Sequence, residues 1–395
     1  MRHPLAAFDR TTLWHLLQHY TEHLDPDAPV SVAESEAAVG DEAIAQRLMN
    51  VFHEMIEHEQ SHIAPERRPN SGIWEMVRHE FHGEFYRIMA DRDAAALAAY
   101  LRNGLRRAIA YGLGPGAEVF DAMRETGAGR HANLALLADR LASLAVAIGA
   151  LPHENPEQGR YGTNLTLAIS DLATLIEAHL GVHIFRPPVA GLFGVEVAPG
   201  RIIDVRVPDD AYCAFRLRML SDTLGFSRIC EIGAGFGGTA FQAARHGLVP
   251  YTIIDLPAIN VLQGYFLMKI FGGDAVRMFS ETVPDRPFSV LPYWMFFDSS
   301  VAFDLVFNRD SMPEMPEARV REYLHEIEER RCALLSVNQE SEGIAERAGA
   351  QQLMVHRLAK AYPGLRSASR HPYWTRKGYV EELFLPLPDR PRVEP

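Results

Sequence analysis

The sequence contains little cysteine and no long apolar run. The three cysteines, Cys213, Cys230 and Cys332, lack metal-ligand spacing, and the last two fall inside predicted strands. A cysteine in a strand is usually a small buried apolar residue, so we expect no disulfide framework and a reducing, cytoplasmic location. No uncharged apolar run approaches about 18 residues, and the N-terminus lacks the apolar core of a signal peptide. We therefore expect a soluble protein without a membrane span.

Basic residues are scarce relative to acidic ones. The 395 residues include 39 Lys and Arg against 51 Asp and Glu, which gives a net charge of −12. Such a chain lacks the positive surface that binds nucleic-acid phosphates or anionic membranes, so we expect neither partner. The length exceeds one typical domain, and we find no internal repeat or low-complexity segment. Two domains are therefore expected.

The first 150 residues are predicted to be helical, because their apolar residues recur at helical spacing and almost nothing alternates with period two. The predicted helices cover 8–24, 41–62, 72–90, 93–112, 117–125 and 133–150. We expect an α-helical N-terminal domain over 1–150 that forms a homodimer interface. His58 and His62 lie one turn apart, but only one E-x-x-H motif is present. We interpret them as packing or surface residues rather than metal ligands.

Residues 151–210 are predicted to link the two domains. Pro, Gly and Asn are frequent at 151–165, which indicates a loop. A helix follows at 165–180, and an irregular stretch with short extended pieces precedes the next helix, at 211–224. We interpret Asp209 and Asp210 as the cap of that helix.

The stretch 227–257 has the pattern of a nucleotide-binding βαβ unit. A strand at 228–232 leads into a glycine turn, a helix starts at Thr239, and a second strand at 251–254 ends on Asp255. Glycines allow a sharp turn and a close approach of ligand to backbone, and an acid ending the second strand can accept both ribose hydroxyls. The turn contains Gly233, Gly235, Gly237 and Gly238.

This spacing leaves two ligand classes open. Gly233, Gly235 and Gly238 satisfy G-x-G-x-x-G, so a dinucleotide such as NAD fits the motif. Glu231 lies two residues before the first glycine, where we expect its carboxylate to face the pyrophosphate of a dinucleotide unfavourably. A ligand that carries a cation, such as the ammonium group of S-adenosylmethionine, suits that carboxylate better.

Strands and helices alternate from residue 211 onward, which predicts a doubly wound α/β sheet. Residues 284–298 are interpreted as an inserted loop, 342–362 as a helix, and 370–386 as terminal antiparallel strands. The other predicted strands are 228–232, 251–254, 276–279, 302–307 and 332–337.

The C-terminal half resembles the class I S-adenosylmethionine-dependent methyltransferases, and among them the sugar O-methyltransferase family. The resemblance rests on EIGAGFG from Glu231, IIDLP at 253–257, NRDSMPEM at 308–315 and LLSVN at 334–338. It implies a Rossmann-like, seven-stranded methyltransferase domain over 211–395. It also implies S-adenosylmethionine as methyl donor, a sugar or similar hydroxylated small molecule as acceptor, and a helical domain that closes over that acceptor.

The resemblance implies a role for individual residues of the donor site. Glu231 is expected near the amino-acid end of the donor, and Asp255 at its ribose hydroxyls. Leu256 is expected to pack on the adenine, with Ser280 at the adenine amino group. Backbone contacts to the donor are expected from Gly233, Gly235, Gly237 and Asn308. Contacts to substrate groups are expected from Tyr212, Arg216 and Asn338, with Arg216 directed to a carboxylate.

Methyl transfer to a hydroxyl requires alignment and a general base, because an alcohol has a pKa far above 7. The candidates are Asp310 and Glu314, which follow the strand at 302–307, and His371 in the terminal strands. No two adjacent acids follow the strand predicted at 302–307, and this absence favours methyl transfer without a metal ion. Three alternatives to an O-methyltransferase remain open: a methyltransferase with a nitrogen or carboxylate acceptor, an NAD-linked oxidoreductase, and a catalytically silent methyltransferase-like binding module.

Overall fold

The structure is a computed structural model of the 395-residue chain. It describes residues 30–33, 37–69, 73–111, 113, 127–155, 157, 163–283, 285–340, 344–345 and 350–387. The predicted helices at 8–24 and 117–125 lie outside the described residues. Among the helices that are described, none is both long and apolar enough to cross a membrane.

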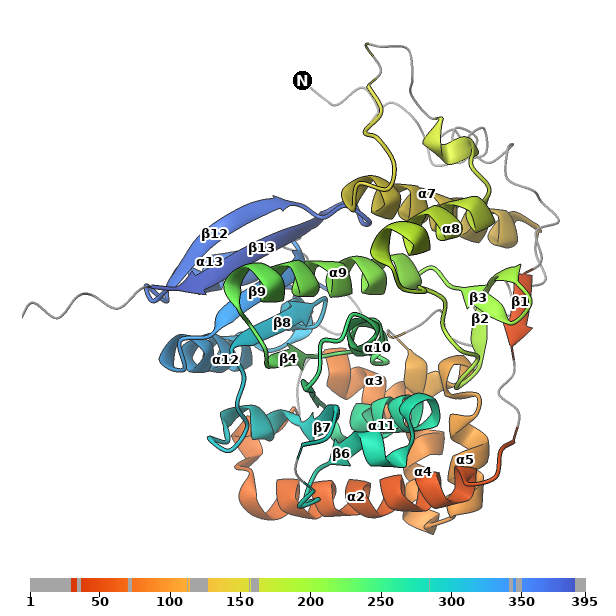
Figure 1. Cartoon of the computed structure of the whole chain (residues 1–395). Coiled ribbons are helices and arrows are strands. Elements are labelled where there is room, and N and C mark those ends of the chain that lie inside the picture. Colours follow the sequence, from red (N-terminus) through yellow and green to blue (C-terminus); the bar gives the residue numbers. More distant parts are fainter. Residues whose placement is uncertain are drawn as a thin grey trace, which may run out of the picture.

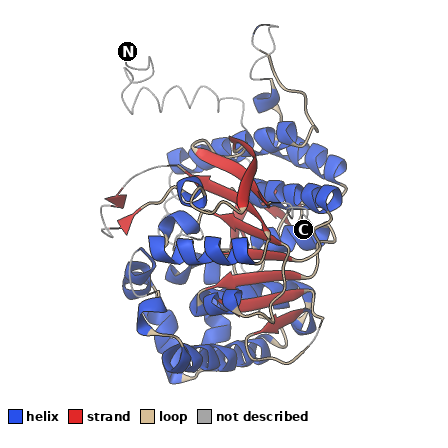
Figure 2. Cartoon of the chain, turned by 90° about the vertical axis from the view of Figure 1, so that its left-hand side faces the viewer, coloured by secondary structure: helices blue, strands red, loops and turns tan. Residues whose placement is uncertain are grey.

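A mostly parallel sheet forms the centre of the molecule, as the alternation predicted (Figure 2). Its eight strands lie in the order β12-β13-β9-β8-β4-β5-β7-β6, and only β13 runs antiparallel to its two neighbours. The strands are β4 (Ile229–Ile232), β5 (Tyr251–Asp255), β6 (Val276–Met278), β7 (Phe288–Pro292), β8 (Leu305–Arg309), β9 (Ala333–Gln339), β12 (Leu365–Pro372) and β13 (Tyr379–Pro386).

The count of seven strands is wrong, because the segment interpreted as a loop at 284–298 contains β7. This short apolar run pairs in parallel with β5 on one side and β6 on the other. Prolines close to both ends of the run, Pro287 and Pro292, give it the appearance of a loop in the sequence. The strand next to β5 is therefore β7, and β6 lies at the edge of the sheet.

Helices connect the parallel strands and cover both faces of the sheet (Figure 2). The chain runs outward from β4 to β5 and then returns to β8 on the other side of β4. Because such crossovers are right-handed, α10 and α12 lie on opposite faces. The helices of this half are α9 (Val207–Leu224), α10 (Gly238–Arg245), α11 (Pro257–Phe271), α12 (Glu317–Glu329) and α13 (Val355–Ala359).

The long helix predicted at 342–362 is wrong in its first half. The described part of this segment contains two short paired strands, β10 (Ile344–Ala345) and β11 (Ala350–Gln351), before α13 begins. Gly343 and Gly349 lie just before these strands in the sequence, and glycine weakens a helix by about 1 kcal/mol relative to alanine.

Helices from the N-terminal part pack at two places on the sheet domain (Figure 1). The helix α2 lies along the lower edge in that view against α11, whereas α7 lies at the top and contacts α8 and α9. The elements are β1 (Val30–Ala33), α2 (Asp41–His62), α3 (Ile73–Phe81), α4 (Gly83–Asp91), α5 (Ala94–Leu101), α7 (Gly127–Ala147), α8 (Ile169–Leu180), β2 (Leu192–Ala198) and β3 (Arg201–Ile203). The helix predicted at 72–90 is two helices, and β1 is a strand within the stretch predicted to be helical.

Close packing and ion pairs attach α2 to the sheet domain. A Cβ added to Gly264 of α11 would lie 2.7 Å from Leu48 Cδ2, so the glycine permits the two helices to approach closely. Arg47 Nε donates to Glu281 Oε1 over 2.7 Å, and Lys269 pairs with the buried Asp41. These contacts hold α2 against α11 and beside β6, the edge strand of the sheet.

Seven short 3-10 helices complete the described secondary structure. They are η2 (Pro65–Arg67), η3 (Gly104–Arg106), η4 (Ala108–Ala110), η6 (Asn164–Thr166), η7 (Gly273–Ala275), η8 (Tyr293–Phe297) and η9 (Met312–Glu314). Two of them, η8 and η9, follow β7 and β8 and help to line the site described next.

Candidate functional site

A cavity of about 290 Å³ lies at the carboxyl ends of β4, β5 and β8. We call it the strand-end cavity. The chain leaves β4 in one direction toward β5 and returns to β8 on the opposite side, so the cavity lies where the strand order reverses. In doubly wound sheets ligands bind at this position. Its wall includes Gly233, Gly235, Asp255, Leu256, Arg309 and Asp310.

The glycine turn after β4 has the left-handed backbone that its sequence predicts. Gly233, Gly235 and Gly237 have φ values of 71°, 56° and 88°. A Cβ at Gly233 would also overlap the Ser311 side chain, so both conformation and space require glycine there. Gly233 and Gly235 line the cavity, whereas Gly237 caps α10 and lies outside the lining.

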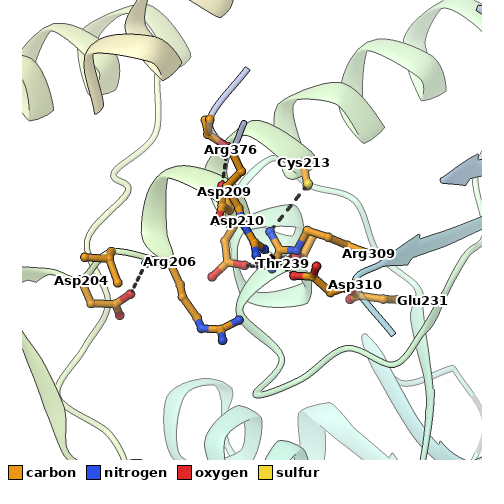
Figure 3. A network of polar contacts seen from close by, with 12 residues as sticks. Asp204, Arg206, Asp209, Asp210, Cys213, Glu231, Thr239, Arg309, Asp310 and Arg376 are labelled. Carbon is orange, nitrogen blue, oxygen red and sulfur yellow. Dashed lines mark hydrogen bonds and ion pairs between the residues drawn. The ribbon is translucent and has the colours of Figure 1, made fainter. Parts of the chain in front are cut away.

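Asp210 lies beside the first turn of α10 (Figure 3). Thr239 Oγ1 donates to Asp210 Oδ1 over 3.3 Å, and a Cβ at Gly238 would overlap the same carboxylate. Asp210 is only 1% exposed and pairs with Arg186 and Arg309. The first turn of α10 therefore packs against the buried ion pair of Asp210 and Arg186, and neither Gly238 nor Thr239 lines the cavity.

Asp209 and Asp210 are not the helix cap predicted from the sequence. The helix α9 begins at Val207, so both residues lie in its first turn. Asp209 is 3% exposed and accepts hydrogen bonds from Thr375 and from Arg140 Nη1, the latter over 3.2 Å. Both acids are thus parts of a buried ionic network rather than caps.

Asp255 lies where the sequence predicted, at the end of β5 and on the cavity wall. Its Oδ2 accepts a hydrogen bond from Gln263 Nε2 over 2.7 Å, and its Oδ1 accepts from the Leu256 amide over 2.8 Å. Burial raises the pKa of Asp255 to about 6, even though both hydrogen bonds lower it. Leu256 lies beside it on the same wall.

Glu231 does not line the cavity, so its position does not support the expected contact with the ligand. The side chain is 2% exposed and accepts a hydrogen bond from the Tyr251 hydroxyl over 2.9 Å. Burial raises the pKa of Glu231 to about 8, against the lowering effect of Arg309. Because side chains alternate along a strand, the neighbouring Ile232 lines the cavity instead.

Asn308 and Asn338 support the site from behind, and neither lines the cavity. Asn308 Nδ2 donates to the Ile232 carbonyl over 2.8 Å and to Ser311 Oγ over 2.6 Å. Asn338 Nδ2 donates to Asn308 Oδ1 over 3.0 Å. These bonds fix the end of β4 against the turn after β8, and the predicted substrate contact by Asn338 is not found.

Three other predicted site residues lie where α9 meets the β12–β13 hairpin, outside the cavity lining. They are Tyr212 and Arg216 of α9 and His371 of β12. Arg216 Nε donates to Glu381 Oε1 over 2.7 Å, and His371 Nε2 lies 3.4 Å from the same oxygen. Tyr212 is 2% exposed and packs edge-on against the ring of Tyr373. The substrate roles of Tyr212 and Arg216 and the catalytic role of His371 are therefore not supported by their positions.

Ser280 is also outside the cavity lining. It follows β6, which the inserted β7 displaces to the edge of the sheet, and its hydroxyl donates to Glu54 of α2. The residue that follows β7 and lines the cavity is Tyr293. The prediction failed because β7 was not recognised as the strand next to β5.

Asp310 and Glu314 both line the cavity but have opposite electrostatic surroundings. Burial alone would raise the pKa of Asp310, but the charges of Arg376 and Arg309 bring it below its usual range. Burial and the negative charge of Asp310 raise the pKa of Glu314 to about 7, despite a hydrogen bond from Trp74. Glu314 therefore has the pKa of a general base that acts near neutral pH, and Asp310 does not.

The cations of the site are not among the residues predicted from the sequence. Arg206, the residue before α9, and Arg376, from the turn between β12 and β13, line the cavity together with Arg309. Arg309 could have been predicted from the sequence, because it ends β8 and the residue that follows it, Asp310, was already a candidate. Trp74 of α3 carries no motif and reaches the cavity only through the packing of the helices.

No group of three or more His, Cys, Asp or Glu side chains within the described ranges is arranged to hold a metal ion.

Comparisons with known proteins give only distant structural similarity. No family model matches the chain, and no curated protein matches its sequence. The mitomycin 7-O-methyltransferase MmcR aligns at 12% identity over 88% of this chain and 97% of its own, with a TM-score of 0.36. An O-methyltransferase family protein from Burkholderia thailandensis aligns at 14% over 46% and 59%, with a TM-score of 0.33. Geranyl diphosphate C-methyltransferase from Streptomyces coelicolor A3(2) aligns at 14% over 46% and 79%, with a TM-score of 0.34. Similarity at this level carries no argument about activity, which depends on the site itself.

Proposed function

We propose that the chain is an S-adenosylmethionine-dependent O-methyltransferase that acts on a hydroxyl of a sugar or similar small molecule. The observation that carries the proposal is the strand-end cavity, where Asp255 and the turn of Gly233 and Gly235 share one wall. An acid at the end of the second strand and a glycine turn at the end of the first are the two parts that a nucleoside needs, for its ribose hydroxyls and for close backbone contact.

The surroundings of the N-terminus of α10 support this donor over a dinucleotide. A pyrophosphate binds to the free peptide N–H groups at the start of such a helix. Here the buried ion pair of Asp210 and Arg186 lies against Gly238 and Thr239, and neither of these two residues lines the cavity, so a pyrophosphate in the cavity would not reach that end of the helix. The donor that we propose has no phosphate and leaves that end of the helix unused. Glu231, which lies outside the cavity lining, does not contribute to this preference.

The charges on the wall suit a ligand that carries both signs. Arg206 and Arg309 lie on the side of α9 and β8, near the glycine turn, and are suited to a carboxylate. Asp310 and Glu314 follow β8 and can face a sulfonium or ammonium group. Leu256 provides an apolar surface beside Asp255, where we place the adenine.

The donor supplies an electrophilic methyl group, and the protein has to align the acceptor and remove its proton. We assign Glu314 as the general base, because it lines the cavity and its pKa is about 7. As the acceptor oxygen bonds to the methyl carbon, the carbon–sulfur bond breaks and its electron pair stays on sulfur. The hydroxyl proton moves to the Glu314 carboxylate. Asp310 is held ionised by Arg376 and serves electrostatic positioning.

Calorimetric titration with S-adenosylhomocysteine and with NADH tests the donor. We expect S-adenosylhomocysteine to bind, NADH not to bind, and the affinity to fall at least about tenfold in Asp255→Asn, since a hydrogen bond to a charged group contributes about 1.5–3 kcal/mol. Asp274→Asn is the matched control, because Asp274 is 98% exposed and outside the cavity. Binding of NADH alone would overturn the proposal and return the glycine turn to a dinucleotide.

A further inference from the structure

A second cavity of about 370 Å³ lies between the N-terminal helices and the start of α11. We call it the helical cavity. Its walls come from α2, α3 and α4 and from residues 256–259, which follow β5. It shares Pro69, Trp74, Leu256 and Ile259 with the strand-end cavity, so the two cavities adjoin across these side chains. No residue of the donor site other than Leu256 belongs to the helical cavity.

Aromatic rings and one pair of opposite charges line the wall of the helical cavity. Phe52, Trp74 and Tyr86 line it, and the face of an aromatic ring packs well against another ring. Glu59 and Arg78 also line it and are close enough for the charge of Arg78 to lower the pKa of Glu59, which burial raises. Because these two charges oppose each other, the wall favours a ligand without net charge.

One buried polar atom of this cavity lacks a partner. His82 is 3% exposed, and its Nε2 atom makes no hydrogen bond to any described residue. Burial, together with the charge of Arg78, lowers the pKa of His82 to about 4, so the ring is neutral at physiological pH. An unsatisfied buried polar group costs about 1–3 kcal/mol, which a hydroxyl group of a ligand would recover. The other histidine of the wall, His53, is already paired through Nε2 with the Met89 carbonyl over 3.0 Å.

The position of Trp74 connects this cavity to the chemistry. Trp74 lies on both walls, and its indole hydrogen-bonds to Glu314. A group that extends from the helical cavity past Trp74 therefore arrives beside the carboxylate that we assign as the base. The donor lies on the other side, along Leu256 and Asp255.

We propose that the helical cavity holds the methyl acceptor, a neutral hydroxylated ring compound, with one hydroxyl on His82 and another directed past Trp74 toward Glu314. The assignment rests on the proposed function. A sugar ring and a phenolic ring share this chemistry, since both present a flat apolar face and neutral hydroxyls. A phosphorylated or carboxylated acceptor does not share it.

The test measures binding of three probes by ligand-observed NMR to the full chain saturated with S-adenosylhomocysteine. The probes are methyl glucoside, catechol and glucose 6-phosphate, each at about 10 mM, which detects dissociation constants near 1 mM. The variants are His82→Phe, which removes the nitrogen and keeps a ring, and Ile56→Trp, which fills the cavity. The matched control is His79→Phe, because His79 is on the adjoining helix, outside the cavity, with a side chain 69% exposed.

We expect methyl glucoside or catechol to bind, glucose 6-phosphate to bind more weakly, and affinity to fall at least about tenfold in His82→Phe and Ile56→Trp but not in His79→Phe. Which of the first two probes binds distinguishes a sugar from a phenol. Equal binding by wild type and both cavity variants overturns the inference, and so does the absence of binding by every neutral probe. Affinity for S-adenosylhomocysteine is measured in each variant as the check on folding. If wild type does not bind S-adenosylhomocysteine, the proposed function fails. The three variants, tested with the ring probes in the absence of S-adenosylhomocysteine, still decide whether the helical cavity binds ring compounds.

Discussion

Replacing Glu231 with Gln tests how the buried carboxylate titrates. The folded chain holds the pKa of Glu231 at about 8, well above its usual value of 4.5. Between these two values the unfolded chain has lost the proton and the folded chain keeps it. The folded state then binds more protons, so the free energy of unfolding falls as pH rises, by about 1.4 kcal/mol per pH unit. Over the full window this loss is on the order of 4 to 5 kcal/mol.

Glu231→Gln removes this titration and keeps an oxygen to accept the Tyr251 hydroxyl. Its new NH₂ group adds a cost that does not depend on pH, so the slope is the informative quantity. Urea unfolding measured from about pH 5 to 7.5 should give a slope less negative than that of wild type by about 1.4 kcal/mol per pH unit. Glu329→Gln, at an exposed position of α12, should keep the wild-type slope.

Two results would refute this reasoning. Equal slopes in wild type and Glu231→Gln would mean that the buried group is already ionised in the folded chain. A tenfold loss of affinity for S-adenosylhomocysteine in the variant would mean that the carboxylate contacts the ligand, as the sequence alone had indicated. We expect that affinity to change less than about twofold, because the side chain does not line the cavity.

The remaining predictions concern the base, the ionic network and the donor carboxylate. The kcat/KM of wild type should rise with pH through about 7 as Glu314 ionises. Glu314→Gln should remove this rising limb of the pH profile and lower kcat by about 10² to 10⁴. Glu322→Gln, also on the cavity wall, should keep the rising limb and the wild-type kcat. Persistence of the limb in Glu314→Gln would exclude Glu314 as the base. Asp210→Asn should lower the free energy of unfolding by about 3–5 kcal/mol, because it leaves two buried arginines poorly compensated, while Asp222→Asn at the exposed end of the same helix should change it by under about 1 kcal/mol. Equal effects of the two in urea unfolding would contradict the network. Arg206→Gln should weaken S-adenosylhomocysteine about tenfold or more in calorimetry and leave adenosine unchanged; equal losses for both ligands would place Arg206 away from the donor carboxylate.

Local patterns in the sequence predicted the centre of the fold and part of the site. The turn of Gly233 and Gly235 and the acid Asp255 could be placed because a strand, a glycine turn and a second strand determine each other over about 25 residues. Asp310 and Glu314 could be placed at the cavity because residues that follow parallel strands gather at one edge of the sheet. In both cases short-range geometry is sufficient.

Long-range packing determined what could not be predicted. A strand with prolines close to both ends inserts beside β5, so Ser280 follows the edge strand rather than the strand at the cavity. Arg206 precedes α9 and Arg216 lies within it, and the packing of this helix places Arg206 on the cavity wall and Arg216 against Glu381. Trp74 of α3 and His82, which precedes α4, carry no motif, and the packing of the N-terminal helices against the start of α11 places both on the helical cavity.

The buried network around Asp210 has the largest consequence for function, although the sequence offered it only as a helix cap. Replacing a buried ion pair by apolar residues is often neutral or stabilising, so stability alone is a weak reason for burying two arginines with an acid. The position of the acid gives a better one. With Arg186, Asp210 fills the space beside the first turn of α10, and through Arg309 it holds a cation on the cavity wall. We therefore expect this network to favour the zwitterionic nucleoside that we propose over a pyrophosphate, a preference that the spacing of the glycines alone does not reveal.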